Sequence, residues 1–423
     1  MLQVSYIRQN REKVLEKLAV KNFYQATLID EVIALDDERK RLQSEFDNAQ
    51  ARVNSASKEI GLLMRQGQKE SAETLKAEVA SVKAQIEPLK VQMVEVDKQL
   101  TDKVLLIPNL PAAEVPKGKT PEDNVTVKEG GTTPNIPGNS LPHWELTNKY
   151  KLIDFELGTK ITGSGFPVYT GKGAKLQRAL VQYFLDFNTA AGYLEYLPPF
   201  MVNEESAYGT GQLPDKEGQM YHATADNFYL IPTAEVPVTN VYRDTILKED
   251  DLPIKMTAYS PCFRREAGSY GKDVRGLNRL HQFEKVEIIQ IVHPEKSYET
   301  LDAMVAHVES LLQSLELPYR ILRLCGGDMS FTSAITYDFE VFSAAQHRWL
   351  EVSSVSNFES FQTNRLKCRF KDASGKTQLA HSLNGSSLAL PRIVAALLEN
   401  NQTADGIMLP KVLHTYFGAE WIM

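Results

Sequence analysis

The sequence predicts an α+β protein with a helical arm, a linker and one mixed domain. Apolar residues recur at alternating spacings of four and three through the first hundred residues, which is the pattern of a coiled coil. A segment dense in proline and glycine follows, and beyond it strand-like and helix-like segments are mixed. Because 423 residues are too many for one core of ordinary size, we assign residues 1–105 to the arm, 106–142 to the linker and 143–423 to a catalytic-type domain.

The arm is predicted as an antiparallel helical hairpin. Two apolar runs, at 28–63 and 72–100, are separated by a short turn that contains Gly67. At 1.5 Å per residue each helix spans about 50 Å. Pro88 removes one helical hydrogen bond, so we expect it to interrupt and kink the second helix. The outer faces interleave basic and acidic residues, and a spacer or dimerisation role remains an alternative to nucleic-acid binding.

Composition and charge exclude several classes of protein. Charged residues make up 24% and hydrophobic residues 43%, which is typical of a globular protein and excludes wholesale disorder. The net charge of −7 means that any nucleic-acid contact must use a local basic stripe. The sequence contains no apolar run of membrane-helix length and begins without the apolar run of a signal peptide. The three cysteines are scattered, so we expect reduced thiols, a cytoplasmic protein and no zinc knuckle.

The stretch 262–289 carries the strongest chemical pattern. Two strand-like segments flank a glycine-dotted loop, and strand alternation puts Phe283, Lys285 and Glu287 on one face. The ring of Phe283 could stack on a base, and the Glu287 carboxylate, about 13 Å along the strand, could hold a cation. Arg264 could clamp a phosphate between them. This layout fits an aminoacyl-adenylate, although a surface hairpin with cross-strand ion pairs would share the pattern.

Five short motifs, spread over residues 192–392, resemble those of class II aminoacyl-tRNA synthetases in their seryl form. They are "GYLEYLPPF" (motif 1), "TAE" (the seryl T-x-E loop), "FRRE" with "RLHQFEKVE" (motif 2), "EVSSVSN" (the metal–ATP strand) and "NGSSLALPR" (motif 3). With the arm and the linker, the resemblance covers essentially the whole chain. The sequence is identified as a member of the common bacterial type of this family, without the ligands of the zinc-dependent variant. Phe358 and "FQTNR" depart from the usual pattern and put packing, not chemistry, in doubt.

The resemblance implies a fold and an activity. The fold is a six-stranded antiparallel sheet with flanking helices, in a homodimer with motif 1 at its interface. The activity is ATP-dependent attachment of serine to tRNA(Ser) through a seryl-adenylate with Mg²⁺, and charging of tRNA(Sec) stays open. Two alternatives are an amino acid ligase that acts on a carrier protein and a scaffold with a degenerate catalytic domain. The long arm argues against the first, and intact Arg264, Glu266, Glu351 and Arg392 argue against the second.

The resemblance also assigns roles to residues. Arg264 and Arg392 are the expected catalytic residues, Arg264 bridging serine carboxylate and α-phosphate, and His281 is expected to be a structural hydrogen-bonder. Serine is expected to contact Thr233, Ala234, Glu235, Arg264, Glu287, Asn384 and Ser386. ATP is expected to contact Arg264, Arg265, Glu266, Arg279, Phe283, Glu351, Val352, Ser353, Ser354 and Arg392. Of these, Glu351 and Ser354 would hold the Mg²⁺ that accompanies ATP.

Overall fold

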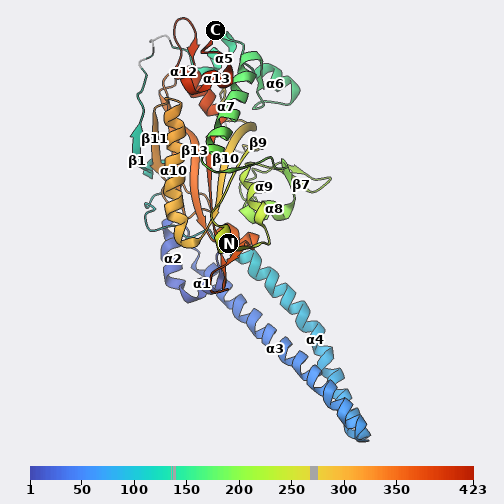
Figure 1. Ribbon diagram of the computed structural model, residues 1–423. Helices are drawn as coiled ribbons and strands as arrows, with labels where there is room; N and C mark the ends of the chain where they lie inside the picture. The colour runs from blue at the N-terminus through green and yellow to red at the C-terminus, as the bar shows by residue number, and fades with distance from the viewer. Residues whose placement is uncertain (135, 137–139, 267–274) are drawn as a thin grey trace. The chain divides into compact units, whose positions relative to one another are not determined.

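The computed structural model describes residues 1–134, 136, 140–266 and 275–423 (Figure 1). The chain divides into two compact units, one formed by Met1–Ala19 and Phe23–Pro108 and the other by Val20–Asn22 and Asn109–Met423. Within the described ranges, we find no helix that is both long and apolar enough to cross a membrane.

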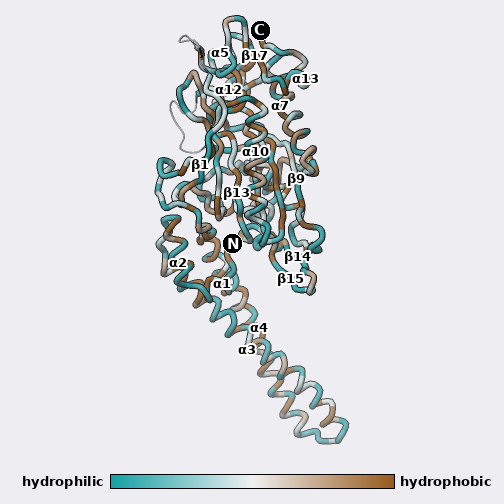
Figure 2. The backbone as a smooth tube through the Cα atoms, turned by 60° about the vertical axis from the view of Figure 1, so that its left-hand side comes forward, coloured by the Kyte–Doolittle hydropathy of each residue, from teal (hydrophilic) through white to brown (hydrophobic). Residues whose placement is uncertain are grey.

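The first unit contains the predicted helical hairpin. Its helices are α1 (Val4–Gln9), α2 (Arg11–Val20), α3 (Ala26–Arg65) and α4 (Lys69–Val104). Helices α3 and α4 pair along their length, and Gly67 makes the turn with a positive φ of 77°. Hydrophobic and hydrophilic residues alternate along both helices (Figure 2). The buried seam includes Leu28, Val32, Leu42, Val53, Ala56, Ala72, Leu75, Val79 and Leu100, which confirms the predicted hairpin.

The predicted interruption at Pro88 is wrong. Helix α4 runs through Pro88 without a break. Proline removes the hydrogen bond to the carbonyl of Ala84, but both residues are exposed, so water can bond that carbonyl. Packing against α3 supports the turns on either side.

Several basic side chains of this unit are already paired with acids. Asp36, with a side chain only 3% exposed, binds Arg8, Arg39 and Lys40 at 2.7–2.8 Å. Although partial burial opposes the effect, hydrogen bonds from these three side chains hold the pKa of Asp36 well below its usual range. Asp36 therefore links α1 to α3. It also pairs with Arg39 and Lys40, two basic residues of the predicted outer face.

The second unit is built on a sheet of eight strands. Their order is β1–β11–β12–β13–β16–β10–β9–β4, and every described neighbouring pair is antiparallel except β4 with β9. The six strands expected from the resemblance form the centre, so the expected number is wrong because one further strand is added at each edge. The strands are β1 (Val125–Gly130), β4 (Leu194–Tyr196), β9 (Ile254–Phe263), β10 (Gln282–Val292), β11 (Tyr319–Arg323), β12 (Ile335–Ser343), β13 (Arg348–Glu359) and β16 (His381–Ala389).

The segment 106–142 is not the coreless linker that its composition indicates. It contains the edge strand β1, and Leu110, Ala112 and Val115 are buried. The Asn109 side-chain amide donates to the carbonyls of Thr332 and Phe358 at 2.9 and 2.8 Å. Nearly all side chains of β1 are exposed, so the strand has no apolar pattern and is held by backbone pairing with β11. Residues 135 and 137–139 of this segment lie outside the described residues.

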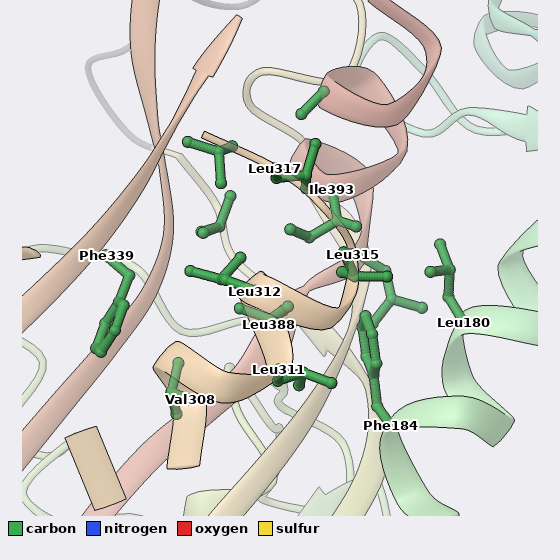
Figure 3. Close-up of a cluster of buried hydrophobic side chains, with 14 of the residues drawn as sticks. Leu180, Phe184, Val308, Leu311, Leu312, Leu315, Leu317, Phe339, Leu388 and Ile393 are labelled. Carbon is green, nitrogen blue, oxygen red and sulfur yellow. The ribbon is translucent and has the colours of Figure 1, made fainter. Parts of the chain in front are cut away.

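The main core lies between one face of the sheet and three helices. These are α7 (Gly171–Ala190), α10 (Ser297–Ser314) and α12 (Leu390–Asn400). Leu180 and Phe184 of α7, Leu311 and Leu312 of α10, and Ile393 of α12 meet there (Figure 3). Strand β10 alternates, with Val286 and Ile288 in this core and Ile289 in a second cluster on the other face. That other face carries the polar residues of the candidate site.

Smaller elements surround the sheet. The helices are α5 (His143–Lys149), α6 (Phe155–Ile161), α8 (Glu204–Thr210), α9 (Glu235–Thr239), α11 (Phe361–Leu366) and α13 (His414–Phe417). The short strands are β2 (Ile153–Asp154), β3 (Val168–Tyr169), β5 (Met201–Val202), β6 (His222–Ala223), β7 (Phe228–Leu230), β8 (Ile246–Lys248), β14 (Arg369–Lys371), β15 (Thr377–Leu379), β17 (Ile407–Met408) and β18 (Trp421–Ile422).

Candidate active site

Strands β9 and β10 bring the ring and the guanidinium of the charged stretch together. Cys262 pairs with Phe283 in the antiparallel register, and Arg264 lies just beyond the end of β9. The guanidinium carbon of Arg264 lies 5.1 Å from the centre of the Phe283 ring. The backbone N–H of Arg264 donates to the His281 carbonyl at 2.9 Å, and its Nε donates to the Pro232 carbonyl at 3.3 Å. These contacts fix one edge of the guanidinium, and its other nitrogens have no hydrogen bond to the residues that the structure describes.

The two ends of the loop between these strands are joined by an ion pair. The Glu266 carboxylate lies 3.0 Å from Arg279 Nε. Gln219 accepts the backbone N–H groups of Arg265 and Glu266, at its carbonyl and its side-chain oxygen respectively. Residues 267–274 of the predicted loop lie outside the described residues. Glu266 is thus held in place where the loop leaves β9.

His281 has structural partners. Its Nδ1 lies 2.8 Å from the Tyr221 hydroxyl, and its ring stacks on Phe166 with centroids 5.3 Å apart. Gly165 accepts the His281 backbone N–H, and a Cβ at Gly165 would lie 2.5 Å from the His281 ring. This arrangement agrees with the structural role expected for His281.

A buried ion pair lies at the other end of the β10 face. Glu287 is 1% exposed, and its Oε2 lies 2.6 Å from Lys285 Nζ. The Thr233 hydroxyl donates to the same oxygen at 3.1 Å. Ser386 of β16 is directly opposite Glu287 in the sheet register. Three of the expected serine contacts therefore lie together around one carboxylate.

A second buried carboxyl group, that of Glu235, lies beside this pair. Gln362 donates to Glu235 Oε1 at 2.6 Å, and the Thr233 hydroxyl accepts the Glu235 backbone N–H at 3.3 Å. Burial raises the pKa of Glu235 to about 7, against the hydrogen bond from Gln362, and the nearby Glu287 carboxylate adds to the rise. A hydrogen bond from Asn384 acts in the opposite direction. Ala234, between Thr233 and Glu235, is buried in the second cluster.

Two residues of this pocket were not assigned roles from the sequence. Lys285 was placed on the correct face but given no function, and its signal was its position two residues before Glu287 on one strand. Gln362 comes from α11, and its carbonyl oxygen accepts from Ser382 at 2.8 Å. Nothing in the local sequence links Gln362 to Glu235, which is more than a hundred residues away.

The raised pKa of Glu235 predicts a pH-dependent stability. A carboxyl group whose pKa rises on folding stabilises the fold below its unfolded pKa, and this contribution is lost as pH rises through the folded pKa. For Glu235 that window runs from its ordinary value of 4.5 to about 7. The free energy of unfolding of the wild type, minus that of Glu235→Gln, should fall by roughly 2–3 kcal/mol from pH 5 to pH 8. Urea titrations at both pH values measure it, and an unchanged difference would contradict the assignment.

The expected nucleotide end lies on β13 and α12. Arg392, in the first turn of α12, donates from Nη1 to the Glu351 carbonyl at 2.6 Å and lies 3.7 Å from Glu351 Oε2. Its Nε donates to the Asn278 carbonyl at 3.1 Å. Val352 is buried in the main core, and Ser353 Oγ donates to the Ser386 carbonyl at 2.6 Å. The side chains of these two residues are therefore engaged within the fold.

Strands β12 and β13 also bring together oxygen atoms suited to a hard cation. Asp338 is opposite Ser354 in the register, and Glu340 is opposite Glu351. Asp338 Oδ1 is buried and has no hydrogen-bond partner among the described residues. Burial and the Glu351 carboxylate raise the pKa of Asp338. In the described part of the chain no three acidic, histidine or cysteine side chains form a metal site, so a cation here would need further oxygens from a ligand.

Comparisons with known proteins agree with this architecture. The family model of the seryl-tRNA synthetase N-terminal domain matches residues 1–111, and that of the class II core domain (G, H, P, S and T) matches residues 220–401. The serine–tRNA ligase of Salinibacter ruber is 50% identical over 99% of this chain and 98% of the relative. This chain belongs to the seryl-tRNA synthetase family.

Two solved structures extend the comparison across this family. Seryl-tRNA synthetase from Pyrococcus horikoshii, complexed with ATP, matches with a TM-score of 0.93 and 31% identity over 100% of this chain and 99% of that one. The cytoplasmic serine–tRNA ligase of Naegleria fowleri, in complex with AMP, matches with a TM-score of 0.87 and 26% identity over 100% and 98%. The arm and the sheet are therefore both part of the seryl-tRNA synthetase architecture.

Proposed function

We propose that this chain attaches serine to tRNA(Ser) in two steps. The carboxylate of serine attacks the α-phosphate of ATP, forming seryl-adenylate and releasing pyrophosphate. The seryl group then moves to the 3′-hydroxyl of the terminal adenosine of the tRNA. The observation that carries the proposal is the buried acidic cluster of Glu235 from α9 and Glu287 from β10, together with Phe283 of β10 in contact with Arg264.

Arg264 would bridge the two reacting anions. Attack by a carboxylate on a phosphate brings negative charges together, and a planar guanidinium can donate to both at once. Its contact with the Pro232 carbonyl supports this role, because a guanidinium that is already oriented need not reorganise during the reaction. The nucleophile is ionised at the start, so no general base is needed in this step.

The adenosine of ATP would lie between Phe283 and Arg392. Glu266, held by Arg279, would accept a hydrogen bond from the adenine amino group. Arg265 and Arg279 would contribute positive charge toward the phosphates, as Arg392 would toward the γ-phosphate from the positive end of α12. The half-buried setting of Phe283 and Arg392 supports this assignment.

Mg²⁺ would accompany ATP at Glu351 and Ser354. The oxygen donors there suit a hard cation, and the unpartnered oxygen of Asp338 is a further oxygen that could bind one. When bound, the ion would neutralise charge on the phosphates of ATP.

Charge balance supports an amino acid as the ligand of this cluster. Lys285 neutralises one of the two buried acids, which leaves room for one further cation, the ammonium group. Thr233, Glu235 and Glu287 would bind that ammonium. Ser386 and Asn384 would bind the hydroxyl group of serine, and threonine, with its additional methyl group, would have to be excluded by size.

Ser386→Ala should reduce discrimination between serine and alanine. A site that bonds the serine hydroxyl rejects alanine by about 10⁴ or more, because its polar groups would be left unpaired. Loss of one such group should lower kcat/KM for serine by roughly tenfold and narrow the serine-to-alanine ratio, as measured by ATP–pyrophosphate exchange. The matched control is Ser387→Ala, since Ser387 Oγ donates to Asn188 at 2.9 Å on the opposite face of β16. Equal ratios in both variants would remove Ser386 from the hydroxyl site.

Further parts of the proposal concern assembly and tRNA. We propose a homodimer through motif 1, supported by the edge position of β4 and by Leu194 and Leu197, which are 62% and 79% exposed. We place the reaction in the cytoplasm, in line with three free cysteines. Because the first step does not depend on the acceptor, the same adenylate could serve tRNA(Sec).

Two assays test the function. Serine-dependent ATP–pyrophosphate exchange should be present, and serine with total tRNA should yield charged tRNA. A ligase that acts on a carrier protein would give exchange without charging of tRNA. Absence of serine-dependent exchange in the wild type would refute the proposal.

A further inference from the structure

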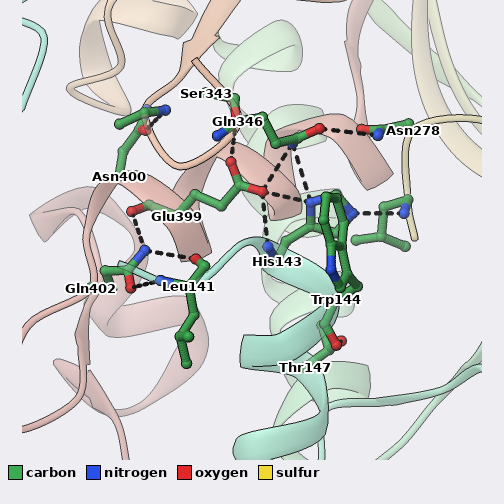
Figure 4. A network of polar contacts seen from close by, with 12 residues as sticks. Leu141, His143, Trp144, Thr147, Asn278, Ser343, Gln346, Glu399, Asn400 and Gln402 are labelled. Atoms are coloured by element: carbon green, nitrogen blue, oxygen red, sulfur yellow. Dashed lines mark hydrogen bonds and ion pairs between the residues drawn. The ribbon is translucent and has the colours of Figure 1, made fainter. Parts of the chain in front are cut away.

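A buried histidine and a buried glutamate meet where the loop between β9 and β10 returns to the fold. His143 begins α5, and Glu399 lies near the end of α12; both side chains are 0% exposed. His143 Nδ1 lies 2.7 Å from Glu399 Oε1, and the His143 backbone N–H donates to the same oxygen at 2.8 Å (Figure 4). On the other side of the ring, Nε2 accepts the backbone N–H of Leu277 at 2.8 Å. His143 thus links Glu399 to Leu277.

The partners define the protonation of the ring. Because the Leu277 N–H can only donate, Nε2 of His143 must be the unprotonated nitrogen, and Nδ1 carries the proton that points at Glu399. Gln346 Nε2 also donates to Glu399 Oε1 at 2.9 Å, and the Ser343 hydroxyl donates to Oε2. Each oxygen of the buried Glu399 carboxyl group therefore has a hydrogen-bond donor, as a buried polar group requires.

Helix α12 also contacts Asn278, the residue after Leu277, through Arg392. Arg392 and Glu399 are about two turns apart on α12 and so face the same side. Arg392 Nε donates to the Asn278 carbonyl at 3.1 Å, and the Asn278 side-chain amide donates to Gln346 Oε1, also at 3.1 Å. Helix α12 therefore holds Leu277 and Asn278 from two positions, one through His143 and Gln346 and one directly.

The contact with His143 is close enough to define the path of the backbone. Gly276 has a φ of +65°, and a Cβ at this position would lie 2.3 Å from His143 Nε2. Only glycine fits against the ring there. The Asn278 carbonyl, two residues further on, is consequently fixed relative to α12.

We propose that His143 and Glu399 are positioning residues for ATP. They fix the Leu277–Asn278 backbone, and the Asn278 carbonyl then orients the guanidinium of Arg392 toward the nucleotide. The inference rests on the proposed function, because it takes Arg392 as an ATP-binding residue. An arginine side chain has many rotamers, and a second acceptor besides the Glu351 carbonyl selects among them before ATP arrives.

The first test is His143→Asn in the full-length protein. The asparagine amide can replace Nδ1 as a donor to Glu399 but is too short to accept the Leu277 N–H. We expect KM for ATP in pyrophosphate exchange to rise about tenfold, the scale of one lost hydrogen bond, with KM for serine changed less than twofold. The control is His307→Asn: His307 Nε2 lies 2.8 Å from Asn188 Oδ1, and His307 has no recorded contact with Leu277, Asn278 or Arg392 in the described part of the chain. Thermal melting of both variants checks that each is folded.

A double-mutant cycle tests the route through Arg392. Calorimetry gives the Kd for ATP of the wild type, His143→Asn, Arg392→Ala and the double variant. If His143 acts through Arg392, adding His143→Asn to Arg392→Ala should not weaken ATP binding further. An equal weakening in both backgrounds would overturn the inference, as would an unchanged KM for ATP in the single variant.

The two proposals fail in different ways. Without serine-dependent exchange in the wild type, the proposed function fails. With normal wild-type exchange and an Arg392→Ala variant that binds ATP weakly, a His143→Asn variant that matches the His307→Asn control refutes only the positioning role.

Discussion

Arg264→Ala should reduce kcat/KM for serine-dependent pyrophosphate exchange by roughly 10²–10³, the effect of losing about 3–4 kcal/mol of transition-state stabilisation. The expected loss is large because, among the described residues of the proposed site, no other group both contacts Phe283 and is held by a backbone carbonyl at its Nε. Removal of this side chain would leave the two reacting anions without their shared donor. The measurement is exchange at saturating and subsaturating ATP.

Arg264→Lys separates shape from charge. Lysine keeps the positive charge, but it cannot donate in a plane to the Pro232 carbonyl and to two anions together. We therefore expect little rescue. The matched control is Arg369→Ala. Arg369 lies on β14, where its Nε donates to the Lys367 carbonyl, and its replacement should retain normal exchange. Near-normal exchange by Arg264→Lys would be incompatible with the bridging role.

Shortening the helical hairpin should abolish charging of tRNA and leave pyrophosphate exchange largely intact. Replacement of residues 43–90 by a short glycine-containing turn removes the outer part of α3 and α4. It keeps the Asp36 ion pairs and the Glu31–Lys103 pair, so the base of the first unit stays supported. The expected separation of the two steps follows from the proposal that only the second step needs the arm. Charging at wild-type rates by the shortened protein would contradict it.

A point variant gives a finer test of the same surface. Reversal of charge at Arg39 or Lys40 would also break the contacts with Asp36, and Arg41 is paired with Glu38 and Glu45. Lys83 has no ion pair recorded in the described residues and is the cleaner choice. Lys83→Glu should weaken tRNA binding and lower the salt dependence of the affinity by about one phosphate contact, with exchange unchanged.

Sequence reasoning succeeded where periodicity determines structure. The coiled-coil spacing identified the seam of α3 and α4, and the two-residue period of strands put Phe283 and Glu287 on one face. It failed for β1, because an edge strand with exposed side chains has no apolar period to read. Pro88 was misjudged because the cost of a lost hydrogen bond depends on exposure, which the sequence does not state.

For the candidate site, too, local patterns grouped residues only within one strand or one motif. Residues within one strand or one short motif could be grouped from the sequence. Gln362 beside Glu235, and His143 between Glu399 and Leu277, depend on pairing between distant segments. No local pattern reports such contacts, so these partners required the folded chain.

The raised pKa of Glu235 has a consequence for amino acid binding. With a pKa of about 7, this carboxyl group populates both its protonated and its ionised form near neutral pH before an amino acid binds. An ammonium group placed beside it would favour the ionised form. Amino acid uptake would then expel a fraction of a proton into the solvent, and the apparent affinity would increase with pH through neutrality. Binding of the amino acid would therefore be coupled to proton release from Glu235.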